Sequence, residues 1–149
     1  MRLSNLADYA VVMLAAAARS DGARLSATCL AEQTGVPLPT AQKLVGRLAA
    51  AGVILSSRGS GGGFRLARDP SAISLADIVE AMEGPIGMTE CSVAQGHCDR
   101  QSQCGVSESW RSVSGAVGGV LRAMTLAQML AARPTASAKD ATRVAQANA

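Results

Sequence analysis

The stretch that decides the fold is residues 36–67, VPLPTAQKLVGRLAAAGVILSSRGSGGGFRLA. Apolar side chains recur at three- and four-residue steps over residues 40–51, which predicts a helix whose first turn tolerates a preceding proline. Two short arms, residues 53–57 and 64–67, then flank the glycines at 61–63. Because glycine supplies the positive φ of a tight turn, this second part predicts a β-hairpin.

Upstream of this stretch the pattern predicts two more helices. Residues 5–19 form an apolar face at helical spacing, and Ser26 is placed to cap a short helix over 27–34 that Gly35 closes. Two short helices joined by a tight turn make a helix-turn-helix, and a hairpin directly after the second of them is a wing. The fold class expected is therefore mainly α with a small β-hairpin, a winged helix-turn-helix.

Downstream of the hairpin, Ser74 is placed to cap a fourth helix, with Asp77 completing a capping box and Gly84-Pro85 ending it. Residues 87–104 show no periodicity. A long C-terminal dimerisation helix is expected from Val106 to about Ala132. Its apolar seam has a spacing typical of coiled coils and consists of Trp110, Val113, Val117, Val120, Met124 and Ala127.

These elements divide the chain into four parts. Residues 1–85 form the expected DNA-binding domain, 86–105 a loop, 106–132 the dimerisation helix, and 133–149 a disordered tail without an apolar stripe.

Composition restricts the classes of protein that remain. Hydrophobic residues make up 48% of the chain but aromatic residues only 2%, so the core is expected to be aliphatic. The longest apolar run, residues 10–18, is too short to cross a bilayer and has no basic leader before it, so neither a membrane span nor a secretory signal is expected. This favours a cytoplasmic protein without membrane partners. Residues 1–70 hold eight of the basic residues against four acidic ones, an imbalance typical of a DNA-binding half.

The predicted helix over 40–51 and the hairpin carry the candidate DNA contacts. A recognition helix needs polar side chains near its start; of these, Gln42 is suited to a base edge and Lys43 and Arg47 to phosphates. The whole candidate set is Thr40, Gln42, Lys43, Arg47, Arg58, Gly61, Gly62, Gly63 and Arg65. The alternative interpretation is a solvated helix face and an ordinary hairpin, or a helix-turn-helix that binds protein.

Three of the four cysteines, Cys91, Cys98 and Cys104, lie in the predicted loop. Their spacing is too wide for a zinc finger, whereas soft thiolates on a loop suit an iron–sulfur cluster. A three-cysteine, one-histidine zinc site with His97, and a redox switch of free thiols, remain alternatives. Cys29 is interpreted as a small core residue.

The chain resembles the family of iron–sulfur winged-helix repressors that includes IscR, the nitric-oxide sensor NsrR and regulators of SUF cluster-assembly operons. The resemblance covers roughly residues 1–132 and is carried by the opening MRLSNLADYAV, the wing RGSGGGFRLAR, the helix ISLADIVEAMEGP, and the three cysteines followed by Trp110. It implies that Cys91, Cys98 and Cys104 ligate the cluster, that Arg58 enters the minor groove and that the helix beginning near Thr40 reads the major groove.

The resemblance leaves the fourth cluster ligand open. The IscR branch uses a histidine three positions after the last cysteine, where this chain has Ser107. The NsrR branch uses an aspartate of the partner subunit, and Asp8 stands at the matching place, although it could equally be a surface carboxylate. His97, Glu90, Glu108 or an exogenous thiol are the remaining options.

The function expected from all this is a homodimeric repressor of iron–sulfur cluster assembly genes that binds double-stranded operator DNA, with a [2Fe-2S] or a [4Fe-4S] cluster. Alternatives are a nitric-oxide or redox sensor of the same family, and a zinc-stabilised interaction module without DNA affinity. No catalytic constellation is evident, and the glycine-rich GSGGG lacks the Lys-Ser/Thr of a phosphate-binding loop, so neither an enzyme nor a small-molecule substrate is expected.

Overall fold

The computed structural model describes residues 3–20, 22–57, 59, 62–93, 98–99 and 103–131. Of the residues predicted to be functional, Arg58 and Gly61 lie outside this set, as do His97 and the tail at 133–149. The described elements, in chain order, are α1 (Asn5–Ala18), α2 (Ala27–Thr34), α3 (Leu38–Ala50), β1 (Ile54–Ser57), β2 (Gly63–Leu66), the 3₁₀ turn η1 (Pro70–Ala72), α4 (Leu75–Glu83), the 3₁₀ turn η2 (Glu90–Ser92), α5 (Ser107–Ala123) and α6 (Leu126–Ala131).

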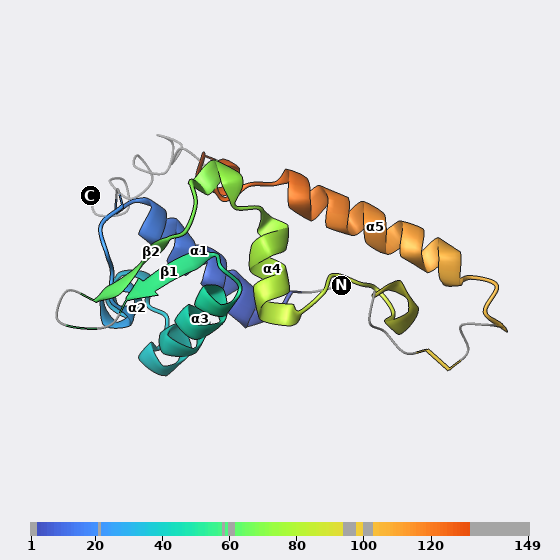
Figure 1. The fold of residues 1–149 in the computed structure, drawn as a ribbon, viewed down its shortest axis with the longest axis horizontal. Coiled ribbons are helices and arrows are strands. Elements are labelled where there is room, and N and C mark those ends of the chain that lie inside the picture. Colours follow the sequence, from blue (N-terminus) through green and yellow to red (C-terminus); the bar gives the residue numbers. More distant parts are fainter. Residues whose placement is uncertain are drawn as a thin grey trace, which may run out of the picture.

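Helices α1 to α4 and the hairpin form one body, from which α5 extends as an arm (Figure 1). The core of this body is aliphatic, as the composition predicts, with Phe64 as its one buried aromatic side chain among the described residues. The largest fully buried side chains are Met13, Leu14, Leu30, Leu44, Leu48, Val53, Ile54, Ile73, Ile78 and Leu126. The predicted winged helix-turn-helix fold is confirmed.

The residues predicted to begin and end the helices of the helix-turn-helix do so within two positions. Ser26 Oγ accepts from the backbone N–H of Cys29 at 3.0 Å and caps α2, and Gly35 ends that helix with a φ of +73°. Helix α3 begins at Leu38 rather than at the predicted Thr40, because Pro39 in its first turn needs no hydrogen-bond donor.

The wing is a two-stranded antiparallel hairpin whose register pairs Ile54 with Leu66 and Ser57 with Gly63. Glycine is required at position 63, where φ is +150° and a Cβ atom would lie 2.8 Å from the carbonyl oxygen of Leu25. This close approach lets Phe64 exchange two backbone hydrogen bonds with Leu25, of 2.9 and 3.0 Å. The base of the wing is thereby fixed to the segment between α1 and α2.

Helix α4 begins with the predicted capping box. Ser74 Oγ accepts from the N–H of Asp77 at 3.1 Å, and the Asp77 carboxylate accepts from the N–H of Ser74 at 2.9 Å. Helix α4 ends before Gly84, which has a φ of +87°. A well-defined α4 places its carboxyl end directly before the segment that carries the cysteines.

The prediction of one continuous helix from Val106 to about Ala132 is wrong in its continuity, because two helices, α5 and α6, take its place. The chain leaves helical geometry at Met124, and a second capping box starts α6: the N–H of Thr125 donates to Gln128 Oε1 at 2.8 Å, and the N–H of Gln128 donates to Thr125 Oγ1 at 3.2 Å. Leu126 donates to the carbonyl of Ile73 and is fully buried. The break therefore returns the chain to the body, where α6 packs on α1 and η1.

Candidate nucleic-acid interface and cysteine segment

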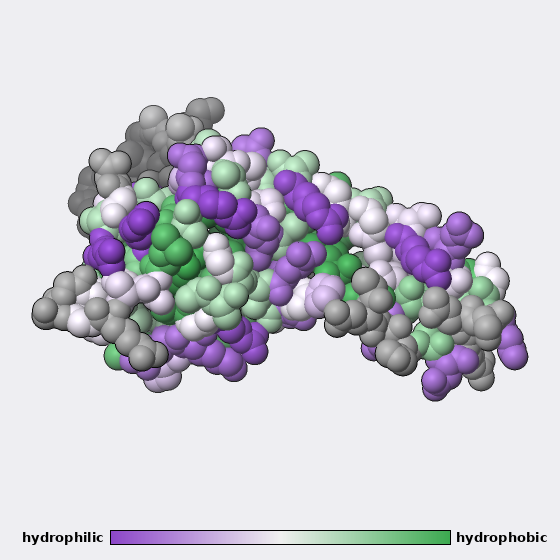
Figure 2. Space-filling model, in the orientation of Figure 1, coloured by the Kyte–Doolittle hydropathy of each residue, from purple (hydrophilic) through white to green (hydrophobic). Residues whose placement is uncertain are grey.

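Helix α3 has one buried and one exposed face. Its buried face consists of Ala41, Leu44 and Leu48, whereas Gln42 and Lys43 are exposed and Thr40 is half-buried. Figure 2 shows hydrophilic side chains along the outer face of the body where α3 lies. The structure thus leaves the predicted base-reading and phosphate-binding side chains accessible near the start of the helix, where a recognition helix contacts DNA.

Arg47 has a partner within the chain that the sequence analysis missed. Its Nη1 donates to the carbonyl oxygen of Met82, near the end of α4, over 2.7 Å. The two residues are 35 positions apart in the chain. Sequence periodicity gives no signal for such a pair, because an arginine that binds a carbonyl of another helix has the same pattern in the sequence as an arginine that binds a phosphate.

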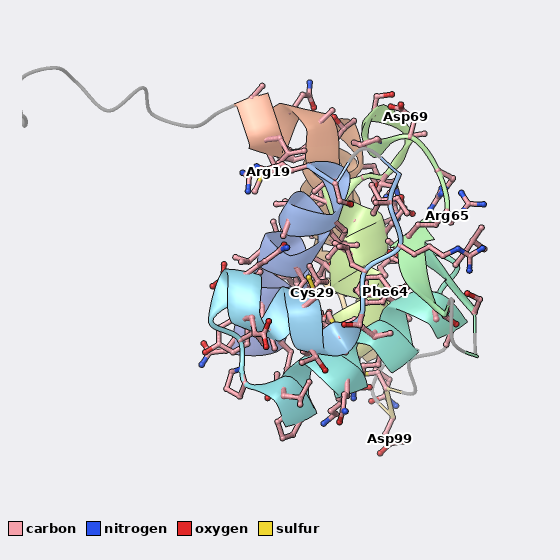
Figure 3. All side chains as sticks on the ribbon, turned by 90° about the vertical axis from the view of Figure 1, so that its left-hand side faces the viewer. Arg19, Cys29, Phe64, Arg65, Asp69 and Asp99 are labelled. Carbon is pink, nitrogen blue, oxygen red and sulfur yellow. The ribbon has the colours of Figure 1, made fainter. Side chains whose placement is uncertain are left out.

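The wing contributes basic side chains beside a glycine tip. Arg65 is exposed on β2 and extends away from the body, whereas its neighbour Phe64 points into the core (Figure 3). Gly62 and Gly63 are half-buried, and of the wing glycines that the structure describes, Gly59 and Gly63 have positive φ. Arg24, absent from the predicted set, donates to Ser57 Oγ and adds a cation at the base of the wing.

Residues 87–104 are here called the cysteine segment. Its three cysteines are all free and half-buried. Within the described part of the chain, no three His, Cys, Asp or Glu side chains lie close enough together to hold a metal ion. The donor chemistry nevertheless fits an iron–sulfur cluster, because accessible thiols that are not tied up in disulfides are the preferred ligands of such clusters. Ligation by all three therefore requires the segment to rearrange.

One end of the cysteine segment is anchored on α5. The N–H of Met88 donates to Ser114 Oγ at 2.9 Å, and Arg111 Nε donates to the carbonyl of Cys91 at 3.3 Å. Thr89 Oγ1 lies 3.2 Å from Cys91 Sγ. Cys91 is thus held against α5 by several contacts along a 3₁₀ turn.

The other candidate ligands lie on three different helices and a 3₁₀ turn. Asp8 is exposed in the first turn of α1, and Glu90 and Glu108 are exposed at the starts of η2 and α5. Cys29 is half-buried on α2 (Figure 3), where Gln33 Nε2 donates toward its sulfur at 3.3 Å. It is therefore not the core residue that the sequence predicted; the buried residue of α2 is its neighbour Leu30.

Helix α5 presents much of its apolar seam to solvent. Trp110, Val113, Val120 and Met124, here called the apolar stripe, are 40%, 44%, 70% and 40% exposed. Small residues are buried instead: Ser114 and Gly118 are the buried positions of α5, which packs on α4. No helix within the described ranges is both long and apolar enough to span a membrane.

A helix-turn-helix followed by a hairpin wing, with accessible polar and basic side chains on its third helix and on the wing, defines a winged-helix DNA-binding protein. Comparison with known proteins gives the family. The chain belongs to the Rrf2 family, whose model, described as "Iron-dependent Transcriptional regulator", matches residues 3–132.

Individual relatives agree with this assignment. The HTH-type transcriptional regulator IscR of Escherichia coli K12 is 30% identical over 131 residues, which cover 87% of this chain and 80% of that protein. Among solved structures, CymR, the global cysteine regulator of B. subtilis, is 26% identical with a TM-score of 0.67 and covers 90% of this chain and 99% of CymR. T. potens IscR is 28% identical with a TM-score of 0.66, covering 92% and 91%.

The protein is accordingly a DNA-binding transcriptional regulator and not an enzyme. A zinc-stabilised interaction module without DNA affinity, one of the alternatives from the sequence, does not agree with membership in this family.

Proposed function

We propose that this chain is an iron–sulfur-dependent repressor that binds operator DNA as a homodimer in the cytoplasm and controls genes for iron–sulfur cluster assembly. The observation that carries the proposal is the position of Cys91, Cys98 and Cys104. All three cysteines are free and half-buried, and they occupy the segment between α4 of the DNA-binding body and α5. The description of the family as iron-dependent regulators supports this assignment.

In this proposal the three thiolates hold the cluster, and the bound cluster would connect the three cysteines of the segment. This connection is lost when iron or sulfide is scarce. The protein contributes a fixed reference for that connection. Ser114 and Arg111 hold Met88 and Cys91 against α5. Cys98 and Cys104 are then the ligands that must approach.

The DNA contacts proposed are those of a winged helix. The amide of Gln42 can donate to and accept from one base edge, while Lys43 neutralises a phosphate. Arg65 does the same from β2, and the remaining proposed contacts are Thr40, Arg58, Gly61, Gly62 and Gly63. Two such units read half-sites about one DNA turn apart, so their spacing in the dimer determines affinity.

The apolar stripe of α5 supports the homodimer. Monomeric proteins seldom leave four large apolar side chains exposed along one helix face. A hollow of about 220 Å³ beside it, lined mainly by apolar residues such as Leu3, Val79 and Leu121, extends this surface onto α4. A second copy of the chain covers both in the proposed dimer.

A nitric-oxide or redox sensor of the same family is the second candidate, favoured by the exposure of Asp8 on α1. A carboxylate from the partner subunit would be a weakly held fourth ligand that small oxidants could replace. Asp8→Ala should then keep a cluster but change its absorption spectrum and shorten its lifetime in air. An unchanged spectrum and lifetime would assign the fourth ligand elsewhere.

The experiment that tests the proposal is metal and sulfide analysis of anaerobically purified protein. Iron and acid-labile sulfide are expected together with visible absorption, and Cys91→Ala, Cys98→Ala or Cys104→Ala should each abolish them. Cys29→Ala is the matched control and should retain the cluster, because this thiol lies on α2. Stoichiometric zinc without sulfide would overturn the proposal.

The proposed target genes are tested by identifying the fragments of genomic DNA that bind to the wild-type protein. The proposal expects fragments upstream of cluster-assembly genes. Enrichment of fragments unrelated to cluster assembly would keep the class of regulator and reject the target.

A further inference from the structure

The carboxyl end of α4 is a junction between three parts of the molecule. The carbonyl of Met82 accepts from Arg47 of α3 at 2.7 Å, and Glu83 Oε1 accepts from the N–H of Ser4, the cap of α1, at 3.2 Å. The ends of α3 and α4 lie side by side (Figure 1). The last carbonyls of a helix lack partners within it and carry partial negative charge, so the Arg47 guanidinium satisfies one of them.

The position of Arg47 on α3 distinguishes it from Lys43. Both residues are exposed, but Lys43 is one turn nearer the start of the helix and has no partner among the described residues, whereas Arg47 bonds Met82. Arg47 lies in the last turn, beside the buried Leu48. A recognition helix contacts bases and phosphates mainly with its first turns, so Lys43 is placed for DNA and Arg47 for α4.

The junction also connects α3 with the cysteine segment. From Met82 the chain passes through Gly84 and Pro85 to Met88, whose N–H is held by Ser114 of α5. The carbonyl that Arg47 binds is therefore six residues before the first anchored residue of the cysteine segment. The cysteine segment therefore follows closely in the chain on the end of α4 that contacts α3.

We propose that Arg47 is a positioning residue that fixes the recognition helix to the carboxyl end of α4 and does not neutralise a DNA phosphate. Its guanidinium sets the orientation of α3, and with it the direction of Gln42 toward a base edge. The proposal replaces the phosphate role that the sequence suggested for this residue. It rests on the DNA binding in the proposed function, but not on the cluster or on the target genes.

The test compares Arg47→Gln with Lys43→Gln, which remove the same charge one helical turn apart. One probe is a DNA duplex that the wild-type protein selects from a random library, and the other is the same duplex with the selected bases scrambled. The affinity for each duplex is measured over a range of salt concentrations. Lys43→Gln should weaken both duplexes alike and lower the slope of log affinity against log salt by about 0.9. Arg47→Gln should leave the slope unchanged and weaken the selected duplex about tenfold more than the scrambled one.

Two further measurements separate positioning from mere destabilisation. A destabilised chain loses active molecules but keeps the ratio between the two duplexes, whereas a misplaced recognition helix lowers that ratio. Arg47→Lys retains a donor and a charge and should restore most of the ratio. In the protein without DNA, Arg47→Gln should speed hydrogen exchange at the end of α4, including the Gly84 amide that bonds Glu80.

A slope that falls by about 0.9 in Arg47→Gln would assign the residue to a phosphate and overturn the inference. An unchanged ratio of the two duplexes, or unchanged exchange at Gly84, would overturn it as well. These outcomes differ from a failure of the proposed function, in which the wild-type protein itself would select no duplex.

Discussion

The winged-helix body and the α5 arm use similar apolar side chains in opposite ways. In the body, Leu44 and Leu48 are almost fully buried, and capping side chains satisfy the ends of α1, α2 and α4. On the arm, Val120 is 70% exposed, while the positions that pack on α4 are Ser114 and Gly118. The body is stabilised by contacts within one chain, whereas the arm leaves exposed the apolar side chains that a second chain covers in the proposed dimer.

Breaking the arm should have the largest effect. Val113→Glu with Val120→Glu places two charges in the proposed interface of each chain. Since burying one valine is worth about 1.5–3 kcal/mol, the dimer should weaken at least a thousandfold or so. Sedimentation at micromolar concentration should then show monomers with an unchanged circular-dichroism spectrum.

The matched control is Ser112→Glu with Gly119→Glu, which has the same spacing on another exposed face of α5. It should remain a dimer. Equal dissociation of both double variants would place the interface off the apolar stripe.

Breaking the core of the body comes next in size. Leu44→Ala removes a fully buried side chain from α3 and should cost about 2–5 kcal/mol in the free energy of unfolding. Leu55→Ala, at a position that is 48% exposed on the wing, should cost far less. Urea unfolding measures both, and losses of similar size would contradict the assignment of these residues to core and surface.

A smaller effect is expected at the DNA-reading surface. Gln42→Ala removes an amide that can donate and accept, so it should reduce discrimination at one base pair by about 1–3 kcal/mol. Binding to duplexes that carry each of the four bases at every position measures this. If the base preference is the same as in the wild type, another side chain reads the groove.

The smallest changes in the free energy of unfolding are expected at the two capping boxes. Ser74→Ala should cost about 1 kcal/mol of unfolding free energy because α4 loses its cap. Thr125→Ala should also destabilise, by a similar or smaller amount, because α6 begins there. If α5 instead continued as one helix through this position, alanine would stabilise by a few tenths of a kcal/mol, so the sign of the change is decisive.

The two capping boxes show how much of the fold can be predicted from the sequence. Ser74–Asp77 predicts a helix start because a turn-forming segment precedes it. Thr125–Gln128 has a similar capping pattern, but apolar residues continue at helical spacing across it and predict an uninterrupted helix. The buried contact of Leu126 with Ile73, 53 positions earlier, decides between the two interpretations, and no local pattern encodes it.

The sequence by itself determined the order of the helices, the wing, the aliphatic core and the separation of the cysteines from the DNA-binding body. Each of these depends on periodicity or on neighbours a few residues away. Only the tertiary structure decided that Gly63 must admit the carbonyl of Leu25, that Arg47 reaches Met82 and that Val113 and Val120 of α5 are exposed. The physical reason is that these contacts join residues far apart in the chain, so they depend on how completed elements pack and not on the residues that form each element.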